Sequence, residues 1–455
     1  MTEAALPPLD RPRPSTRTFF GEPIGLAYLS FTEAWERFSY YGMTALLVLY
    51  MTQALFTPGH IEHIAGFASL RAAFESVRGP MSTLALASQI YGLYTGFVYF
   101  TPVFGGLIAD RFLGRKLSVA IGAVLMSAGH IAMAFDASFL LALVLLITGC
   151  GLLKGNISTQ VGALYAEDDG PGRTRAFSIF SMGINVGAVA GPLVCGLLAQ
   201  RYGWHVGFGL AGVLMLFGLV TYLAGYHTLV EPPPSTVRKE ARAAAGSGNW
   251  RIVLTLVAVM ALTVFQSIAY YQNSNIALVW IDKYVDLNLL GFHVPVAWFN
   301  SIDPFASIIF VPILIALWKW QDSRGGEPGE IMKISTGAWM ACAANLLLFV
   351  ACTISDRVSV IYPFIYDVIL GVAFLYYWPT LLALVSRAAP AGLKATLMGC
   401  AFLSLFVSNI LIGWIGGFYE HLTPAQFWAL EASIAGVGGL LAMLLNKPLK
   451  RLLEH

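Results

Sequence analysis

Twelve long hydrophobic runs follow one another along the chain, separated by short polar segments. A membrane-spanning helix needs about 20 mostly apolar residues, and each run has about that length. Membrane β-strands are shorter segments of about ten residues with alternating polarity, whereas these runs are continuous. The pattern therefore predicts an all-α integral membrane protein with twelve transmembrane helices, at 26–53, 83–109, 117–135, 139–164, 175–200, 204–227, 251–281, 297–320, 331–353, 358–386, 394–417 and 425–446.

The longest polar break divides the runs into two groups of six. It spans 228–250 and contains three consecutive prolines, a basic cluster and a tail of small residues. Such a segment is typical of a linker and is too short to hold an extra helix pair. We expect an N-terminal six-helix bundle over 1–227 and a C-terminal six-helix bundle over 251–455, an arrangement that transporters built from repeats share.

Composition and charge support a membrane protein and set its orientation. The chain is 57% hydrophobic and 11% charged, with a mean hydropathy of +0.70, which excludes a soluble enzyme domain. If the amino terminus is cytoplasmic, 20 of the 27 Lys and Arg residues fall on the cytoplasmic side and five on the other. We expect the protein to lie in a plasma membrane with both termini on the cytoplasmic side, and with membrane lipid as a partner. The net charge of +2 gives no reason to expect a nucleic-acid partner.

Cysteines and histidines give little sign of a metal or a cofactor. The five cysteines are scattered through hydrophobic runs without metal-like spacing, so we interpret them as packing residues. His60 and His63 lie in the segment 54–82, for which we expect a short amphipathic surface helix. Two histidines three residues apart make a weak metal site. We therefore expect no metal, no cofactor and no enzyme activity.

The first hydrophobic run contains charged residues, which are unfavourable in contact with lipid. Glu33, Glu36, Arg37, Tyr40 and Tyr41 are spaced so that they share one face of a helix. An ionisable group near the bilayer centre costs on the order of 3 kcal/mol and normally faces protein or a watery cavity. The spacing therefore indicates a polar pathway, although a buried ion pair that only fixes helix packing is an alternative.

A glycine-rich and basic motif lies in the turn between the second and third runs. The stretch 105–116 reads GGLIADRFLGRK and resembles the signature of the major facilitator superfamily. Its glycines permit close helix approach and a sharp turn, and an aspartate there can cap a neighbouring helix. We predict a conformational role, not substrate binding, for Gly106, Asp110, Arg111, Gly114 and Arg115.

Further stretches resemble the proton-coupled oligopeptide transporter family of that superfamily, in its bacterial type. Residues 33–42 match its E-x-x-E-R-F-x-Y-Y-G element without a gap. Residues 149–158 resemble its G-x-G-x-x-K-x-N-x-S element, and residues 177–187 resemble its fifth-helix signature. Tyr94 falls where the family keeps a cavity tyrosine. The resemblance is strong over the first half of the chain and weaker over the second.

The resemblance implies symport of di- and tripeptides with protons by alternating access, with no catalysis. It assigns the peptide carboxylate to Arg37 and Lys154. It also implies that Tyr40, Tyr94 and Asn185 supply hydrogen bonds. With residues that could meet the ammonium and amides of a peptide, the predicted substrate-binding set is Arg37, Tyr40, Tyr41, Tyr94, Lys154, Asn185, Gln272, Asn273, Asp303 and Asp367. We expect proton coupling to involve Glu33, Glu36, Arg37 and Asp303, because one carboxylate can release the guanidinium when it is protonated. We expect the chain to act as a monomer.

The second half departs from the family pattern. Its seventh run lacks the usual acidic residue, and Phe374 and Trp378 stand where the tenth helix commonly carries Glu and Ser. Asp303 and Asp367 are carboxylates that could replace the missing amine site. Asp303 could instead cap its own helix, and Asp367 could lie in a watery vestibule. Three alternatives follow: a drug/proton antiporter, a carrier of a small anion and, least favoured, a membrane-embedded enzyme.

Overall fold

The computed structural model describes residues 18–19, 21–166, 169–231, 250–390 and 393–454. These residues form an all-helical structure with six two-residue strands. The first group of helices is α1 (Ile24–Tyr50), α2 (Phe67–Arg78), α3 (Thr83–Ile108), α4 (Arg115–Ala132), α5 (Phe139–Ala163), α6 (Gly170–Tyr202) and α7 (Trp204–Gly225). The second group is α9 (Trp250–Tyr271), α10 (Ile276–Tyr284), α11 (Ile302–Asp322), α12 (Glu330–Ile354), α13 (Ile361–Ala388), α14 (Lys394–Gly416) and α15 (Pro424–Glu454).

Short elements join these helices. The 3₁₀ helices are η2 (Ile61–His63), η4 (Asp136–Ser138), η5 (Tyr226–Thr228), η6 (Gln272–Ser274), η7 (Val296–Ser301) and η8 (Gly417–His421), and the π-helical turns are η1 (Met51–Leu55) and η3 (Ala109–Leu113). Strands β1 (Thr18–Phe19) and β2 (Glu22–Pro23) pair antiparallel, as do β4 (Asn288–Leu289) and β5 (Phe292–His293). Strands β3 (Val285–Asp286) and β6 (Val358–Ser359) pair in parallel.

Ten helices in the described part of the chain are long and apolar enough to cross a membrane. Helix α1 is not among them: it has 27 residues but carries Glu33, Glu36 and Arg37 along its length. Helix α4 is not among them either: it has 18 residues and begins with Arg115 and Lys116. The helices follow the hydrophobic runs closely, because a continuous apolar stretch of this length forms a helix that can cross a membrane.

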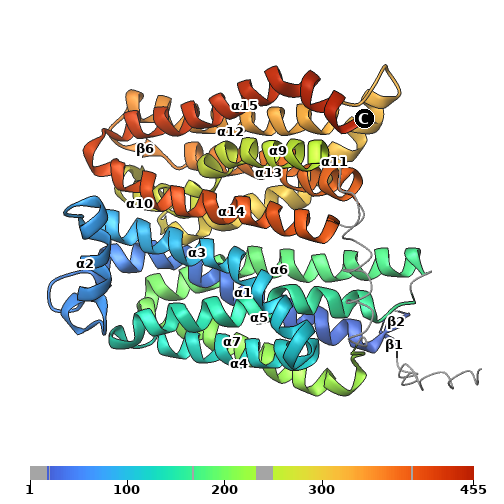
Figure 1. Cartoon of the computed structure of the whole chain (residues 1–455). Helices are drawn as coiled ribbons and strands as arrows, with labels where there is room; N and C mark the ends of the chain where they lie inside the picture. The colour runs from blue at the N-terminus through green and yellow to red at the C-terminus, as the bar shows by residue number, and fades with distance from the viewer. Residues whose placement is uncertain (1–17, 20, 167–168, 232–249, 391–392, 455) are drawn as a thin grey trace, which may run out of the picture.

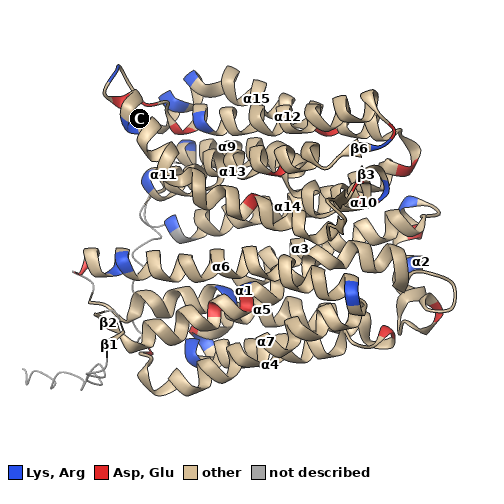
Figure 2. Ribbon diagram, turned by 180° about the vertical axis from the view of Figure 1, so that it is seen from behind, with Lys and Arg blue, Asp and Glu red and all other residues tan. Residues whose placement is uncertain are grey.

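The two groups of helices lie side by side (Figure 1). Helices α1 to α7, blue to green, pack mainly on one another, as do α9 to α15, yellow to red. The two groups meet chiefly where α3 contacts α14 and where α6 contacts η7 and α11. Charged residues gather toward both ends of the helices, and a few lie in the interior near α1 and α5 (Figure 2).

The run 251–281 is broken, not continuous as we expected. Helix α9 ends at Tyr271, η6 follows, and α10 starts at Ile276 after Asn275, whose φ of −119° and ψ of −101° are not helical. The amides of Gln272 and Asn275 hydrogen-bond away from the helix, and such polar side chains compete with helical backbone bonds. The break brings polar side chains to the junction of the two groups.

The two groups are in close contact at the end of the molecule that carries α2, which we call the α2 end. A Cβ atom on Gly92 of α3 would lie 2.4 Å from the backbone carbonyl oxygen of Asn409 in α14. A Cβ atom on Gly416 would lie 2.0 Å from the Ser88 hydroxyl oxygen. Only glycine allows this approach. The Gln53 amide also donates a 2.8 Å hydrogen bond across the groups to Asp282.

The motif between α3 and α4 adopts a tight turn. Gly114 has a φ of +75°, which favours glycine, and Arg115 lies 3.3 Å from Asp110. Glu231, not Asp110, caps α4: its carboxylate accepts hydrogen bonds from the backbone N–H groups of Arg115 (2.5 Å) and Lys116 (2.9 Å). Asp110 does not cap α4, because its carboxylate is engaged by the Arg115 side chain.

Of the two adjacent glycines that begin this motif, Gly105 and not Gly106 permits the close helix approach. A Cβ atom on Gly106 would meet nothing within 4 Å, whereas one on Gly105 would lie 2.0 Å from the Gly151 oxygen of α5. Arg111 is exposed.

An ion pair joins β2 to α6 at the same side of the molecule. The Arg175 side chain donates a hydrogen bond to the Glu22 carboxylate, and this bond holds the pKa of Glu22 below its usual range.

Candidate functional site

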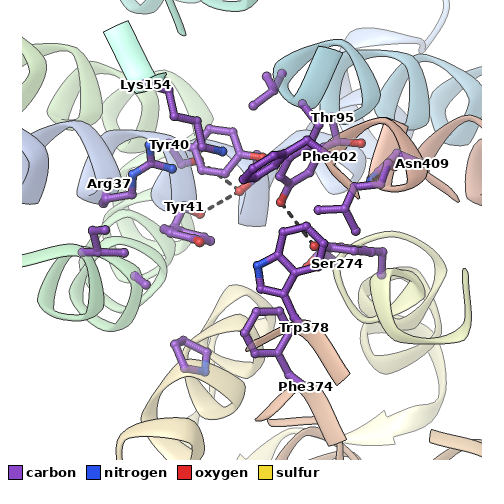
Figure 3. A pocket seen from close by; sticks show the side chains of 18 of the residues that line it. Arg37, Tyr40, Tyr41, Thr95, Lys154, Ser274, Phe374, Trp378, Phe402 and Asn409 are labelled. Carbon is purple, nitrogen blue, oxygen red and sulfur yellow. Dashed lines mark hydrogen bonds between the residues drawn. The ribbon is translucent and has the colours of Figure 1, made fainter. Parts of the chain in front are cut away.

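A cavity of about 660 Å³ lies between the two groups of helices (Figure 3). Its walls come from α1, α3, α5 and α6 on one side and from α9, η6, η7, α11, α13 and α14 on the other. Its volume is typical of sites for small molecules. A molecule in this cavity would contact both groups of helices.

The α1 wall carries an ion cluster of one guanidinium and two carboxylates. Arg37 Nε lies 2.8 Å from Glu33 Oε1 and 2.7 Å from Glu36 Oε2, and all three side chains are buried. Glu33 and Arg37 line the cavity, while Glu36 lies behind them. Two buried carboxylates share one cation, so a proton on either of them would balance the charge of the cluster.

Lys154 of α5 is the second cation on this side. Its ammonium nitrogen lies 4.5 Å from the ring centre of Tyr99 and 5.9 Å from that of Tyr40. Within the described residues, no carboxylate forms an ion pair with it. Aromatic faces stabilise a cation but leave its charge uncompensated. Lys154 is thus suited to receive an anionic group of a bound molecule.

The opposite wall carries Asp303, at the start of α11. Its carboxylate is buried and accepts a hydrogen bond from the Tyr270 hydroxyl of α9, and it does not cap its own helix. Asp367 of α13 is 2% exposed, and one of its oxygens has no hydrogen-bond partner within the described residues. It does not line the cavity, and its burial does not fit a watery vestibule.

Aromatic rings occupy the part of this wall where the family resemblance would place acid and hydroxyl groups. The Phe374 ring stacks on Tyr270, with centres 5.4 Å apart, and Trp378 meets Phe402 edge to face at 5.4 Å. Both Phe374 and Trp378 lie across the cavity from Arg37 and Lys154 (Figure 3). This wall can therefore pack against apolar groups of a ligand.

The structure brings most of the predicted site residues together. Those that line the cavity are Glu33, Arg37, Tyr40, Tyr41, Lys154, Asn185, Asn273 and Asp303. Those that do not are Glu36, Tyr94, Gln272 and Asp367, and their predicted roles would have to be indirect.

Sequence reasoning missed several lining residues. They are Tyr91, Tyr99, Ser274, Phe402 and Asn409 among others. Tyr91, Thr95 and Tyr99 follow one another at spacings of four residues on one face of α3, a signal that helical periodicity could have used. The Tyr99 hydroxyl lies 3.3 Å from that of Tyr271, which joins the two walls of the cavity.

Two groups of membrane-length helices around one polar cavity define a multi-pass membrane transporter. A family model described as the POT family matches residues 116–243 and 233–429, most of the chain. The chain belongs to the POT family.

Similar proteins cover nearly the whole chain. A di-/tripeptide transporter of Lactococcus lactis subsp. cremoris is 28% identical, over 96% of this chain and 98% of that protein. Peptide transporter YePEPT of Yersinia enterocolitica is 26% identical over 97% of each. A crystal structure of peptide transporter POT in complex with sulfate has a TM-score of 0.82 at 28% identity, covering 96% of this chain and 97% of that one. A POT family transporter in complex with a thioalcohol-conjugated peptide has a TM-score of 0.78 at 25% identity, covering 95% and 98%.

Proposed function

We propose that this protein carries di- and tripeptides across the plasma membrane together with protons, by alternating access. The observation that carries the proposal is the charge pattern of the cavity, with Arg37 and Lys154 on one wall and Asp303 on the other. A short peptide is a zwitterion whose carboxylate and ammonium fit such a pair of walls. The named relatives that transport or bind peptides support the same substrate class.

The full architecture is part of this proposal. We infer that α1 and α4 span the membrane together with the ten apolar helices, so that twelve spans form two six-helix bundles over 1–227 and 251–455. The linker 228–250 then adds no helix pair, most of it lying outside the described residues. Both termini are cytoplasmic, so the α2 end faces outward, and the protein acts as a monomer. The turn residues Gly106, Asp110, Arg111, Gly114 and Arg115 serve the change of conformation.

The roles of the site residues follow from their places. Lys154 and Arg37 hold the peptide carboxylate, with Tyr40, Tyr41, Tyr94 and Asn185 as hydrogen-bonding neighbours. Asp303 receives the ammonium, beside Asn273, while Gln272 and Asp367 act from behind the wall. Protonation of Glu33 or Glu36 loosens the cluster around Arg37 and couples a proton to movement of α1. Asp303, buried and close to the substrate, is the further proton-coupling residue.

The test is uptake of radiolabelled dialanine into proteoliposomes, with and without an inward proton gradient. The purified protein should accumulate dialanine only with the gradient, and Arg37→Ala should abolish uptake. Glu33→Gln and Glu36→Gln should lose uphill accumulation and keep exchange of dialanine, because exchange needs no net proton movement. Glu62→Gln, on the exposed η2, is the matched control. Gradient-independent accumulation, or none, would contradict the proposal.

Phe374 and Trp378 favour a second candidate, a carrier of a small anion, because they leave the amine wall with few polar groups. Such a carrier needs no ammonium acceptor. Asp303→Asn would then leave transport intact, whereas a peptide carrier should lose preference for dialanine over its N-acetyl derivative. A drug/proton antiporter would take up cationic drugs in exchange for protons and would ignore dialanine.

A further inference from the structure

Besides Asp303 and Asp367, the second group of helices contains another buried carboxylate, Glu431, distant from the ion cluster of α1. Glu431 sits two turns into α15, and its side chain is completely buried. One oxygen accepts a 3.0 Å hydrogen bond from the Gln272 amide of η6. The other oxygen has no hydrogen-bond partner in the described part of the chain.

No positive charge compensates Glu431. Within the described residues it forms no ion pair, and the titratable group that faces it is the Tyr366 hydroxyl of α13, which also lacks a partner. The hydrogen bond that it accepts within the described residues comes from the neutral Gln272 amide. An ionised carboxylate in such a place costs several kcal/mol. A neutral, protonated side chain avoids this cost.

Hydrogen bonds connect Glu431 to the other group of helices. The Asn275 amide donates to the Gln272 oxygen (3.1 Å) and to the Ser88 hydroxyl of α3 (2.7 Å), which in turn donates to the Gly413 carbonyl (3.2 Å). Glu431, Gln272, Asn275 and Ser88 are all fully buried. We call these four residues the α15–α3 chain. It runs through the break between α9 and α10 and crosses the contact between α3 and α14.

This contact is the tight one at the α2 end. Ser88 packs against Gly413 and Gly416 so closely that neither could carry a Cβ atom without displacement. When α3 separates from α14, as alternating access requires at the outer side, Ser88 leaves Asn275 and the contact opens. Water can then reach Gln272 and Glu431 from outside. The protonation of Glu431 is thereby tied to the state of the outer contact.

We propose that Glu431 is an additional proton-binding residue of the transport cycle, besides the α1 cluster and Asp303, loaded from outside when the α2 end is open. Its carboxylate takes a proton from water, forming a neutral carboxylic acid, and only the neutral side chain is tolerated when α3 closes on α14. The inference rests on the proposed symport and adds a coupling residue to it. Glu431 lies in the second group of helices. The first span of that group, which is the seventh of the chain, lacks the acidic residue that the family resemblance led us to expect.

Infrared spectroscopy tests the protonation without any substrate. The carbonyl stretch of protonated carboxyl groups, and its shift in D₂O, should be present in the parent protein at neutral pH, and Glu431→Gln should lose the part of this band that Glu431 contributes. Glu62→Gln should keep the band. A spectrum of Glu431→Gln identical to that of the parent would overturn the proposal, since Glu431 would then carry no proton.

The number of protons per peptide tests the coupling. Each coupled proton contributes about a tenfold accumulation per unit of pH gradient, because about 1.4 kcal/mol corresponds to a factor of ten. At a gradient of one unit we therefore expect Glu431→Gln to accumulate dialanine about tenfold less than the parent, with exchange retained. Glu431→Asp keeps a titratable group and should recover the parent ratio.

The outcomes separate the two proposals. Equal accumulation by the parent and Glu431→Gln would overturn the role of Glu431 and leave peptide symport standing. A parent protein that fails to accumulate dialanine would contradict the proposed function itself. If Glu431→Gln fails to fold, a Glu431→Asp variant whose accumulation is independent of external pH would overturn the coupling role, and a parent-like pH profile would support it.

Discussion

At the scale of single residues, Lys154 is the side chain whose charge most needs a ligand. It rests on Tyr99 and has no ion-pair partner in the described residues, while Arg37 already has two. The two cations therefore differ in how far their charge is already compensated by carboxylates. In the proposed mechanism both cations hold the substrate carboxylate, but Arg37 is shared with Glu33 and Glu36, whereas Lys154 has no such competitor in the described residues.

Lys154→Gln should weaken binding of peptides that have a free carboxylate. A hydrogen bond to a charged group contributes about 1.5–3 kcal/mol, so the half-maximal concentration of dialanine should rise roughly 10- to 100-fold. Dialanine amide, which lacks the carboxylate, should bind parent and variant equally. Lys283→Gln is the control, because Lys283 also lies over a tyrosine ring but outside the cavity. Unchanged competition by dialanine would refute this role.

The sequence revealed individual charges better than their partners. Glu33, Glu36 and Arg37 stood out because a charge within an apolar run has few explanations. The same reasoning applied to 425–446 would have found Glu431, which we overlooked. The bond between Tyr270 and Asp303, in contrast, joins two helices whose relative rotation no hydropathy pattern specifies.

At the scale of elements, the approach of α3 to α14 depends on glycine. Gly92→Ala places a Cβ atom 2.4 Å from the Asn409 oxygen and 2.9 Å from the Gly413 backbone. Overpacking costs about 1–3 kcal/mol, so the closed state of the α2 end should become roughly 5- to 150-fold less populated. Spin labels at Gln53 and Asp282 should report longer distances in this variant. Gly209→Ala, where nothing lies within 4 Å, should leave them unchanged.

Unchanged distances in Gly92→Ala would contradict this prediction, because the closed α2 end would then accommodate the added methyl group. Helix positions were predictable from sequence because apolar length determines them, and α12 at Glu330–Ile354 differs from 331–353 by one residue at each end. The break at Gln272–Asn275 was not predictable from hydropathy. It depends on amide side chains that find partners on α3, α14 and α15, which are distant in sequence.

At the scale of the whole molecule, alternating access requires the two groups of helices to separate at the α2 end. Gln53→Cys with Asp282→Cys places a thiol on each side, at a site where the native pair is hydrogen-bonded at 2.8 Å. Joining these thiols with a short cleavable reagent should reduce dialanine uptake to background. Cleaving the reagent should restore it, and either single-cysteine variant should be unaffected. Full uptake by the joined protein would exclude movement at this end.

The cap that Glu231 places on α4 has a consequence for how the two groups of helices are connected. Although Glu231 follows α7 in the chain, it is held by the first group, so the free connection begins only after it. Residues 232–249 separate Glu231 from Trp250, where α9 starts. At about 3.3–3.6 Å per residue, a tether of that length could reach roughly 60 Å when fully extended. The covalent connection thus sets only an upper limit on how far Glu231 and Trp250 can separate, and in this structure the contacts of α3 with α14 and of α6 with η7 and α11 hold the two groups against each other.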